Sequence, residues 1–122
     1  MKKKEVRNQQ EFDACVAKNN IAVVIGCKIV ARGNSTVEAW ENGIVVAREN
    51  SKVVAWENST VEAWDNSTVE AWGNSTVIAW GNTFIRFFSC LKITASQGVV
   101  ILKHNKSDSI DGGRQLDAIK IQ

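Results

Sequence analysis

The sequence of 122 residues contains no proline, no tyrosine, one histidine and three cysteines, so few side chains are available as metal ligands or nucleophiles. A single histidine excludes a multi-histidine metal site, and Cys15, Cys27 and Cys90 lack the CxxC spacing of zinc and redox motifs. We therefore predict reduced thiols, no metal and no cofactor. Ser89 or Cys90 paired with His104 would lack a third group to orient the base, and we predict that the protein is not an enzyme.

Long hydrophobic runs are also missing. The longest apolar stretches, residues 21–26 and 98–102, are far shorter than the roughly 20 residues of a membrane helix. The lysines at positions 2–4 precede polar residues rather than the apolar segment of a secretory signal. A net charge of +2 is too small to indicate nucleic-acid binding. These absences predict a cytoplasmic protein with neither a membrane nor a nucleic-acid partner.

The sequence is dominated by an eight-residue repeat, seen most clearly as NSTVEAW followed by an acidic residue or glycine. The fourth position is β-branched in all ten octets between residues 26 and 105, and the sixth is alanine in eight of them. Repetition over so many units predicts a stacked repeat fold. Asparagine opens seven consecutive octets, at Asn34, Asn42, Asn50, Asn58, Asn66, Asn74 and Asn82.

An eight-residue period does not fit an α-helix, because turns of 3.6 residues would spread the apolar side chains around the whole helix. Within each octet the side chains alternate in the manner of a β-strand. The Glu-Asn, Asp-Asn and Gly-Asn dipeptides between strands are typical of tight turns. We therefore predict an all-β fold, a parallel β-solenoid of about ten octapeptide strands over residues 26–105.

The alternation also predicts which side chains face the interior. Valine or isoleucine at position four, alanine at six and serine at two lie on one side of each strand, and tryptophan lies with glutamate on the other. Placing the indoles inside would carry Glu38, Glu62 and Glu70 into the core, at a cost of several kcal/mol each. We therefore expect the tryptophans on the outer surface.

Two octets per coil would give a flat solenoid with 16-residue coils, and three would give a triangular one with 24-residue coils. Serine, valine and alanine are too small to fill the centre of a triangle, which favours two. A 24-residue coil would stack Glu38 on Glu62, although it would also gather apolar residues into one outer column. We predict the 16-residue coil and keep the 24-residue coil as the alternative.

Both ends of the repeat are expected to be capped. Residues 8–18 have Asn8 in an N-cap position, Glu11 three residues later and apolar residues at helical spacing, which predicts a short helix that plugs the first coil. Ile21 and Val23 resemble part of an additional strand. We divide the chain into an N-terminal tail and capping helix at 1–25, the solenoid at 26–105, and a C-terminal cap or tail at 106–122.

The tandem NSTVEAW units resemble the octapeptide-repeat β-solenoid proteins of bacteria and prophages over about residues 26–97, and more loosely the octets of bacterial ice-nucleation proteins. The resemblance implies a scaffold that acts by contact. We expect a phage-borne inhibitor in the cytoplasm of a bacterial host, which binds a defence or nucleic-acid-handling protein and forms a homodimer or other homo-oligomer. The alternatives are a self-assembling structural scaffold and, because outward threonines can order water, an ice-binding protein.

Two outward groups are the candidate partner-binding residues. With 16-residue coils, one aromatic column lies on each sheet, comprising Trp40, Trp56, Trp72 and Phe88 on one and Trp64 and Trp80 on the other. Stacked aromatics also stabilise neighbouring strands, so a purely structural role is the alternative. The asparagines are assigned a structural role as a ladder of amides at the turns. Acidic side chains form a predicted strip suited to a basic groove on a partner, comprising Glu38, Glu41, Glu49, Glu57, Glu62, Asp65 and Glu70.

Overall fold

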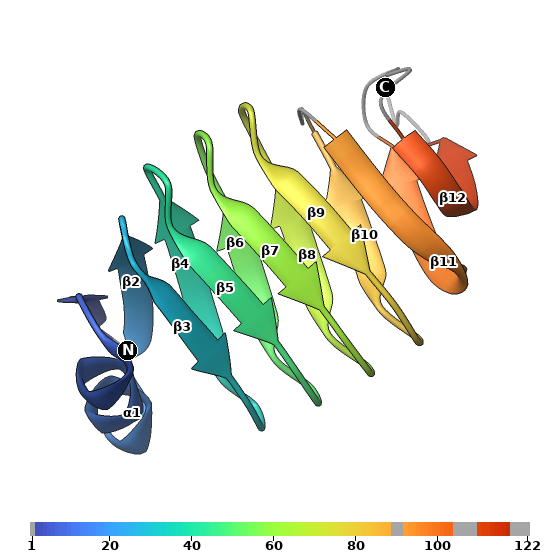
Figure 1. Cartoon of the computed structure of the whole chain (residues 1–122). Helices are drawn as coiled ribbons and strands as arrows, with labels where there is room; N and C mark the ends of the chain where they lie inside the picture. The colour runs from blue at the N-terminus through green and yellow to red at the C-terminus, as the bar shows by residue number, and fades with distance from the viewer. Residues whose placement is uncertain (1, 89–91, 104–109, 118–122) are drawn as a thin grey trace, which may run out of the picture.

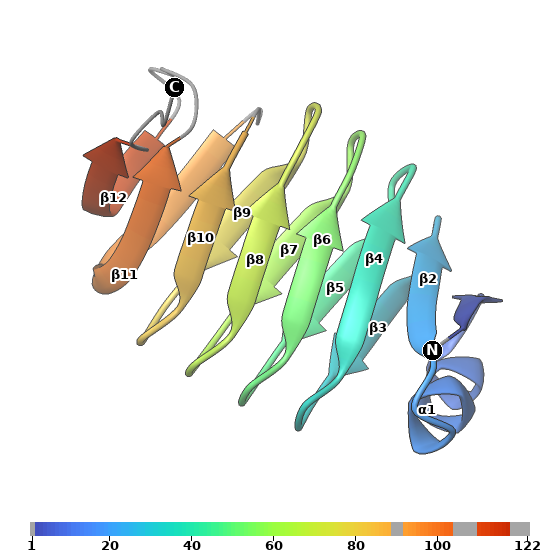
Figure 2. The ribbon, with the colours of Figure 1, turned by 180° about the vertical axis from the view of Figure 1, so that it is seen from behind.

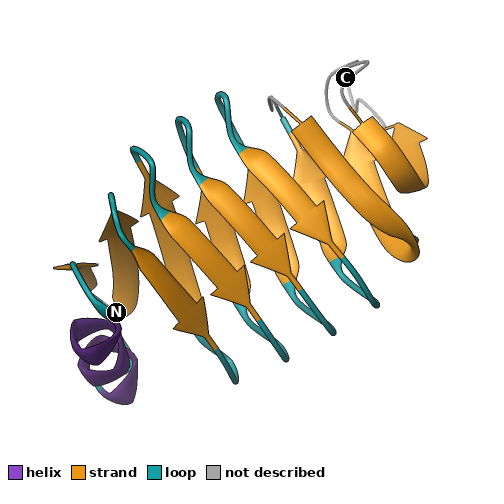
Figure 3. Cartoon of the chain, in the orientation of Figure 1, coloured by secondary structure: helices purple, strands orange, loops and turns teal. Residues whose placement is uncertain are grey.

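The computed structural model describes residues 2–88, 92–103 and 110–117, which form a flattened tube of β-strands (Figure 1). A short helix lies at one end of the tube, and loops line its two edges (Figure 3). The predicted parallel β-solenoid is confirmed. The elements are β1 (Lys3–Val6), α1 (Gln9–Ala17), β2 (Ile21–Ile25), β3 (Lys28–Ala31), β4 (Thr36–Trp40), β5 (Ile44–Ala47), β6 (Lys52–Ala55), β7 (Thr60–Ala63), β8 (Thr68–Ala71), β9 (Thr76–Ala79), β10 (Phe84–Phe87), β11 (Lys92–Lys103) and β12 (Ile110–Asp117).

The strands pair in parallel and lie on two opposite sides of the tube (Figures 1 and 2). We call β1-β2-β4-β6-β8-β10, with the second half of β11, the first sheet, and β3-β5-β7-β9, with the first half of β11, the second sheet. Val37 pairs with Val53, and Val53 with Val69, so successive coils are 16 residues apart. The 16-residue coil is confirmed, and the 24-residue alternative is excluded.

The core consists of the inward positions of each octet. The β-branched residues at position four are at most 1% exposed from Ile29 to Ile101. The alanines at position six are equally buried from Ala31 to Ala79, and the repeated serines are also buried. All five tryptophans lie on the outside and are partly exposed. The predicted orientation is therefore confirmed, and each small inward side chain packs on its counterpart in the next coil.

The corners between strands are tight turns closed by a hydroxyl group. The Ser51 hydroxyl donates to the Arg48 carbonyl at 2.8 Å, and the Ser67 hydroxyl donates to the Trp64 carbonyl at 2.7 Å. Because these hydroxyls point inward, the bond satisfies a buried polar group that would otherwise be costly. The same three-residue contact is made by Ser35, Ser59 and Thr83.

The N-terminal helix α1 begins as predicted. The Asn8 side chain accepts a hydrogen bond from the Glu11 backbone N–H at 2.8 Å, and Phe12 and Cys15 are buried against the first coil. The solenoid also extends further than the repeat. β1 pairs with β2, and β2 pairs with β4, so the sheet begins before residue 26, within the segment assigned to the tail and helix. In β2 the inward residues are Ala22 and Val24.

The edge of β3 that faces the N-terminal end is covered by one side chain of α1. The Gln9 amide oxygen accepts from the Val30 backbone N–H at 2.7 Å, and the amide nitrogen donates to the Val30 carbonyl at 2.9 Å. This amide therefore takes the place of a neighbouring strand at the end of the second sheet. The same nitrogen lies 2.9 Å from Oδ1 of Asp13, which holds it in place.

The C-terminal end departs from the octet pattern. The octets at 90–97 and 98–105 are joined in one strand, β11, and β12 pairs with both of its halves across a shift in register. β12 therefore adds a layer within the segment predicted as a cap, and the solenoid has about six coils rather than five. Ser89, Cys90 and His104 lie outside the described residues. The described helix has nine residues and is too short to cross a bilayer.

Candidate protein-interaction surfaces

The outer face of the first sheet, here called the first face, carries a continuous aromatic stack. Trp40 and Trp56 lie 5.0 Å apart between ring centroids, Trp56 and Trp72 lie 5.2 Å apart, and Trp72 and Phe88 lie 3.9 Å apart, with interplanar angles of 13° or less. Because each ring covers the flat side of the next, the stack presents mainly ring edges to a partner. Such a surface suits contact with another protein better than stacking of sugars or bases.

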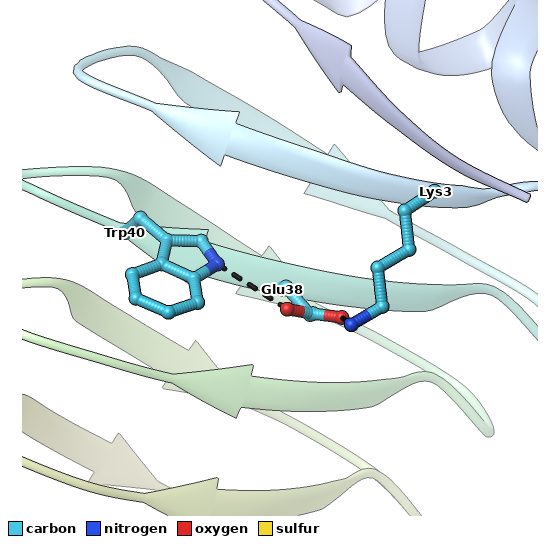
Figure 4. Close-up of polar contacts among 3 residues, drawn as sticks. All are labelled: Lys3, Glu38 and Trp40. Atoms are coloured by element: carbon cyan, nitrogen blue, oxygen red, sulfur yellow. Dashed lines mark hydrogen bonds and ion pairs between the residues drawn. The ribbon is translucent and has the colours of Figure 1, made fainter.

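Glu38 holds the first indole of this stack and is itself neutralised (Figure 4). Its Oε1 accepts from Trp40 Nε1 at 3.3 Å, and its Oε2 lies 2.8 Å from Lys3 Nζ. The residue is only 9% exposed. Lys3 was predicted only as part of a basic tail, but β1 places it beside Glu38 in the sheet. A carboxylate that is buried and paired in this way adds little negative charge to the surface.

The second indole of the stack lacks the corresponding acceptor. Val54 occupies the position before Trp56 that Glu38 occupies before Trp40, and the buried Trp56 Nε1 has no hydrogen-bond partner among the described residues. An unsatisfied buried donor is uncommon in folded proteins and destabilises them. The substitution of valine for the repeat's glutamate is thus visible as a local defect in the stack.

The remaining acid on the first face, Glu70, is also paired within the chain. Its Oε1 lies 3.8 Å from Arg86 Nη1, in the next strand of the same column. The Arg86 guanidinium also lies 5.4 Å from the Phe88 ring centroid. The charges of Glu38 and Glu70 are therefore balanced by Lys3 and Arg86. Apolar side chains gather on the C-terminal half of this face, all outward and partly exposed: Trp72, Phe84, Phe88, Val100 and Leu102.

The outer face of the second sheet, here called the second face, carries a shorter aromatic column. Trp64 and Trp80 stack at 4.0 Å with an interplanar angle of 17°. The Arg48 guanidinium lies 5.5 Å from the Trp64 ring centroid, as the 16-residue register predicted for these neighbours. The geometry of both predicted aromatic columns is thus present, whereas their role in partner binding stays a prediction.

The predicted acidic strip is not a single surface. Glu38 and Glu70 lie on the first face and Glu62 lies on the second, while the other four acids lie at the corners, which alternate between the two edges of the tube (Figure 1). The sequence places these residues in one segment, but a 16-residue coil distributes one segment over both faces and both edges. Glu41 and Glu57 occupy one edge, and Glu49 and Asp65 occupy the other.

Two of these corner carboxylates bind the backbone of the preceding coil. Glu49 accepts from the Gly33 N–H at 2.9 Å, and Asp65 accepts from the Glu49 N–H at 3.2 Å. The contact repeats after 16 residues and links three successive coils along one edge. Sequence reasoning treated both acids as ligands for a partner and did not foresee that they stabilise the turns.

The seven repeated asparagines also form two rows rather than one. The side chains of Asn34, Asn50, Asn66 and Asn82 lie along one edge, and those of Asn42, Asn58 and Asn74 along the other; all are exposed. At the described corners, serine and Thr83 hydroxyls donate the side-chain hydrogen bonds within the turn. Asparagine provides the left-handed backbone at Asn42 and Asn58, with φ of 65° and 59°; in most other turns the preceding residue does so.

Threonine rows are too short to form an ice-binding surface. Thr60 and Thr76 are neighbours on the second face, but Lys52 separates Thr36 from Thr68 on the first. A regular, uncharged array would be needed to order water over several coils. The register therefore provides no support for the ice-binding alternative.

One cavity, of about 580 Å³, lies between α1 and the start of the second sheet, with Phe12, Asp13, Val16, Val30 and Arg32 in its lining. Burial raises the pKa of the nearby Cys15 thiol, which disfavours the nucleophilic thiolate at neutral pH. Among the described residues, no group of three or more metal-binding side chains occurs. The cavity therefore offers an acid and an arginine without a paired nucleophile and base.

Comparisons with protein-family models, with curated proteins and with solved structures found no match for this chain. The interpretation of the two faces therefore depends on their own chemistry.

Proposed function

We propose that this chain is a non-catalytic interaction protein that binds another protein through its first face. The observation that carries the proposal is the apolar cluster around Phe84, Val100 and Leu102 beside the stacked Trp72 and Phe88. Contiguous exposed apolar side chains on a rigid sheet are typical of protein interfaces. A partner would bury the ring edges and the neighbouring aliphatic groups together.

The charges on this face favour an interaction driven by apolar contact. Glu38 and Glu70 are paired with Lys3 and Arg86 within the chain, so long-range attraction by unpaired acids is weak. Binding should consequently depend little on salt. The narrower expectation, a phage-borne inhibitor of a host nucleic-acid-handling protein, draws on the family resemblance. The dispersal of the acids weakens its electrostatic argument.

The test is affinity capture from a bacterial lysate with matched variants of one outward column. Val100→Lys lies in the apolar cluster, and Thr36→Lys lies in the same column at the opposite end of the first face. We expect a protein that binds wild type and Thr36→Lys at low and high salt but does not bind Val100→Lys. Equal capture by all three chains, or capture that high salt abolishes, would contradict the proposal.

The structural-scaffold alternative predicts that the chain captures only itself and forms long assemblies by end-to-end stacking. The N-terminal end opposes such stacking, because α1 lies against it and Gln9 occupies the backbone groups of Val30. Electron microscopy of concentrated protein distinguishes filaments from discrete particles.

A further inference from the structure

The second face differs from the first in how its charges are paired. Its middle column is apolar except at Glu62, which lies between Val46 and Ile78 on the neighbouring strands. Among the described residues Glu62 makes no ion pair, in contrast to Glu38 and Glu70 on the first face. A carboxylate within an apolar column is best stabilised by a cation that arrives with a covering surface.

A suitable cation is present in the adjacent column of the same face. Arg48 is exposed, lies over the edge of the aromatic column at Trp64, and makes no ion pair among the residues described. Glu62 belongs to β7 and Arg48 to the end of β5, so one is displaced from the other by one strand and one column. This displacement makes the face self-complementary about a two-fold axis.

We propose that a second copy of this chain covers the second face, with Glu62 of each copy against Arg48 of the other. The two-fold axis is perpendicular to the sheet and passes between β5 and β7, and between the middle and aromatic columns. The same operation brings Val46 against Trp64 of the second copy, and Val30 against Trp80. It also places Ile78 under the aliphatic stem of Arg32.

The arrangement has the properties of an isologous interface, because each contact occurs twice. Like charges do not meet, and each aromatic ring meets a valine. Five strands about 4.8 Å apart, with three outward residues spaced about 6.8 Å, make a face of roughly 24 by 20 Å. Two such faces bury roughly 1,000 Å², which is near the lower limit for a specific interface. We therefore expect a dimer that dissociates in the micromolar range.

Charge reversal provides the decisive test, measured by sedimentation velocity from low micromolar to sub-millimolar concentration. In an Arg48→Glu chain, glutamates would face each other across the interface, and in a Glu62→Arg chain arginines would do so. We expect each variant alone to dimerise at least tenfold more weakly than wild type. An equimolar mixture should recover the dimer, because the mixed pair restores both opposite-charge contacts.

The mixture separates an interface from an effect within one chain. Arg48 and Glu62 are diagonal neighbours in the same molecule, so a double variant could regain stability without any partner, whereas two separate chains can compensate only across an interface. The matched control is Lys52→Glu, an exposed charge reversal on the first face, which should leave dimerisation unchanged. Circular dichroism verifies that all variants are folded.

Several results would overturn the proposal. Wild type that stays monomeric throughout the concentration range excludes the dimer. A dimer that Lys52→Glu disrupts, or that both second-face variants retain, uses another surface. Failure of the mixture to recover the dimer removes the Glu62–Arg48 pairing. None of these outcomes affects binding of another protein through Val100 on the first face, so the two proposals are tested separately.

Discussion

Replacing Val54 by glutamine should stabilise the protein, because it supplies the hydrogen-bond acceptor that the Trp56 indole lacks. Glu38 reaches Trp40 Nε1 from the equivalent position at 3.3 Å, and glutamine has the same length as glutamate. Satisfying a buried donor returns about 1–3 kcal/mol, and exchanging valine for glutamine in a strand costs up to about 1 kcal/mol. We expect a gain of about 1 kcal/mol, or about 4 °C in Tm for a domain of this size.

Val54→Glu should gain less than Val54→Gln. A glutamate at this position would lie directly between Glu38 and Glu70, with strands about 4.8 Å apart, and like charges in neighbouring strands repel. Salt should narrow the difference between the two variants. Val54→Thr is the matched control, because it keeps the β-branch but its hydroxyl is too short to reach the indole. Urea unfolding measures all four proteins. A Val54→Gln chain no more stable than Val54→Thr would refute the reasoning.

Three further perturbations test the corner, the cap and the buried thiol. Ser67→Ala should lower the free energy of unfolding by about 1 kcal/mol in urea titrations through loss of the bond to Trp64, whereas Asn66→Ala, at the exposed position beside it, should cost less. Gln9→Ala should cost about 1–3 kcal/mol, because it exposes the backbone of Val30, and Gln10→Ala should be nearly neutral; equal effects in either pair would contradict these roles. Because burial raises the pKa of Cys15 above 9.0, its alkylation by iodoacetamide at pH 8.5 should be much slower in the folded chain than in urea. The stability that depends on this thiol should be intact below pH 9 and be lost as the pH rises further; equal alkylation rates would show that the thiol is not protected.

The repeated part of the fold could be predicted from the sequence because two constraints act on every octet. The alternation within NSTVEAW assigns valine and alanine to one side, and the turn dipeptide ends each strand at a fixed length. Small inward side chains then exclude a wide coil. The stacking of Trp40 on Trp56, and of Trp64 on Trp80, follows from the coil length alone.

The ends were harder to predict because no repeat marks them. The pairing of Lys3 with Glu38 depends on a β1 strand whose sequence, KKEV, is mainly charged and resembles a solvated tail. The Gln9 contact with Val30 depends on where α1 packs, which helical spacing does not determine. The acidic strip failed for a different reason: proximity in sequence was taken for proximity in space, although alternate octets face opposite sides of the tube.

The central claim is that neighbouring coils are 16 residues apart with the indoles stacked on the outside, and contacts between indole ring protons test it most directly. A NOESY spectrum, with signals assigned by single Trp→Phe variants, should show contacts between Trp40 and Trp56 and between Trp56 and Trp72, whose centroids lie 5.0 and 5.2 Å apart. Contacts between Trp40 and Trp64, or between Trp56 and Trp80, would instead require a 24-residue coil and would contradict the placement of both faces.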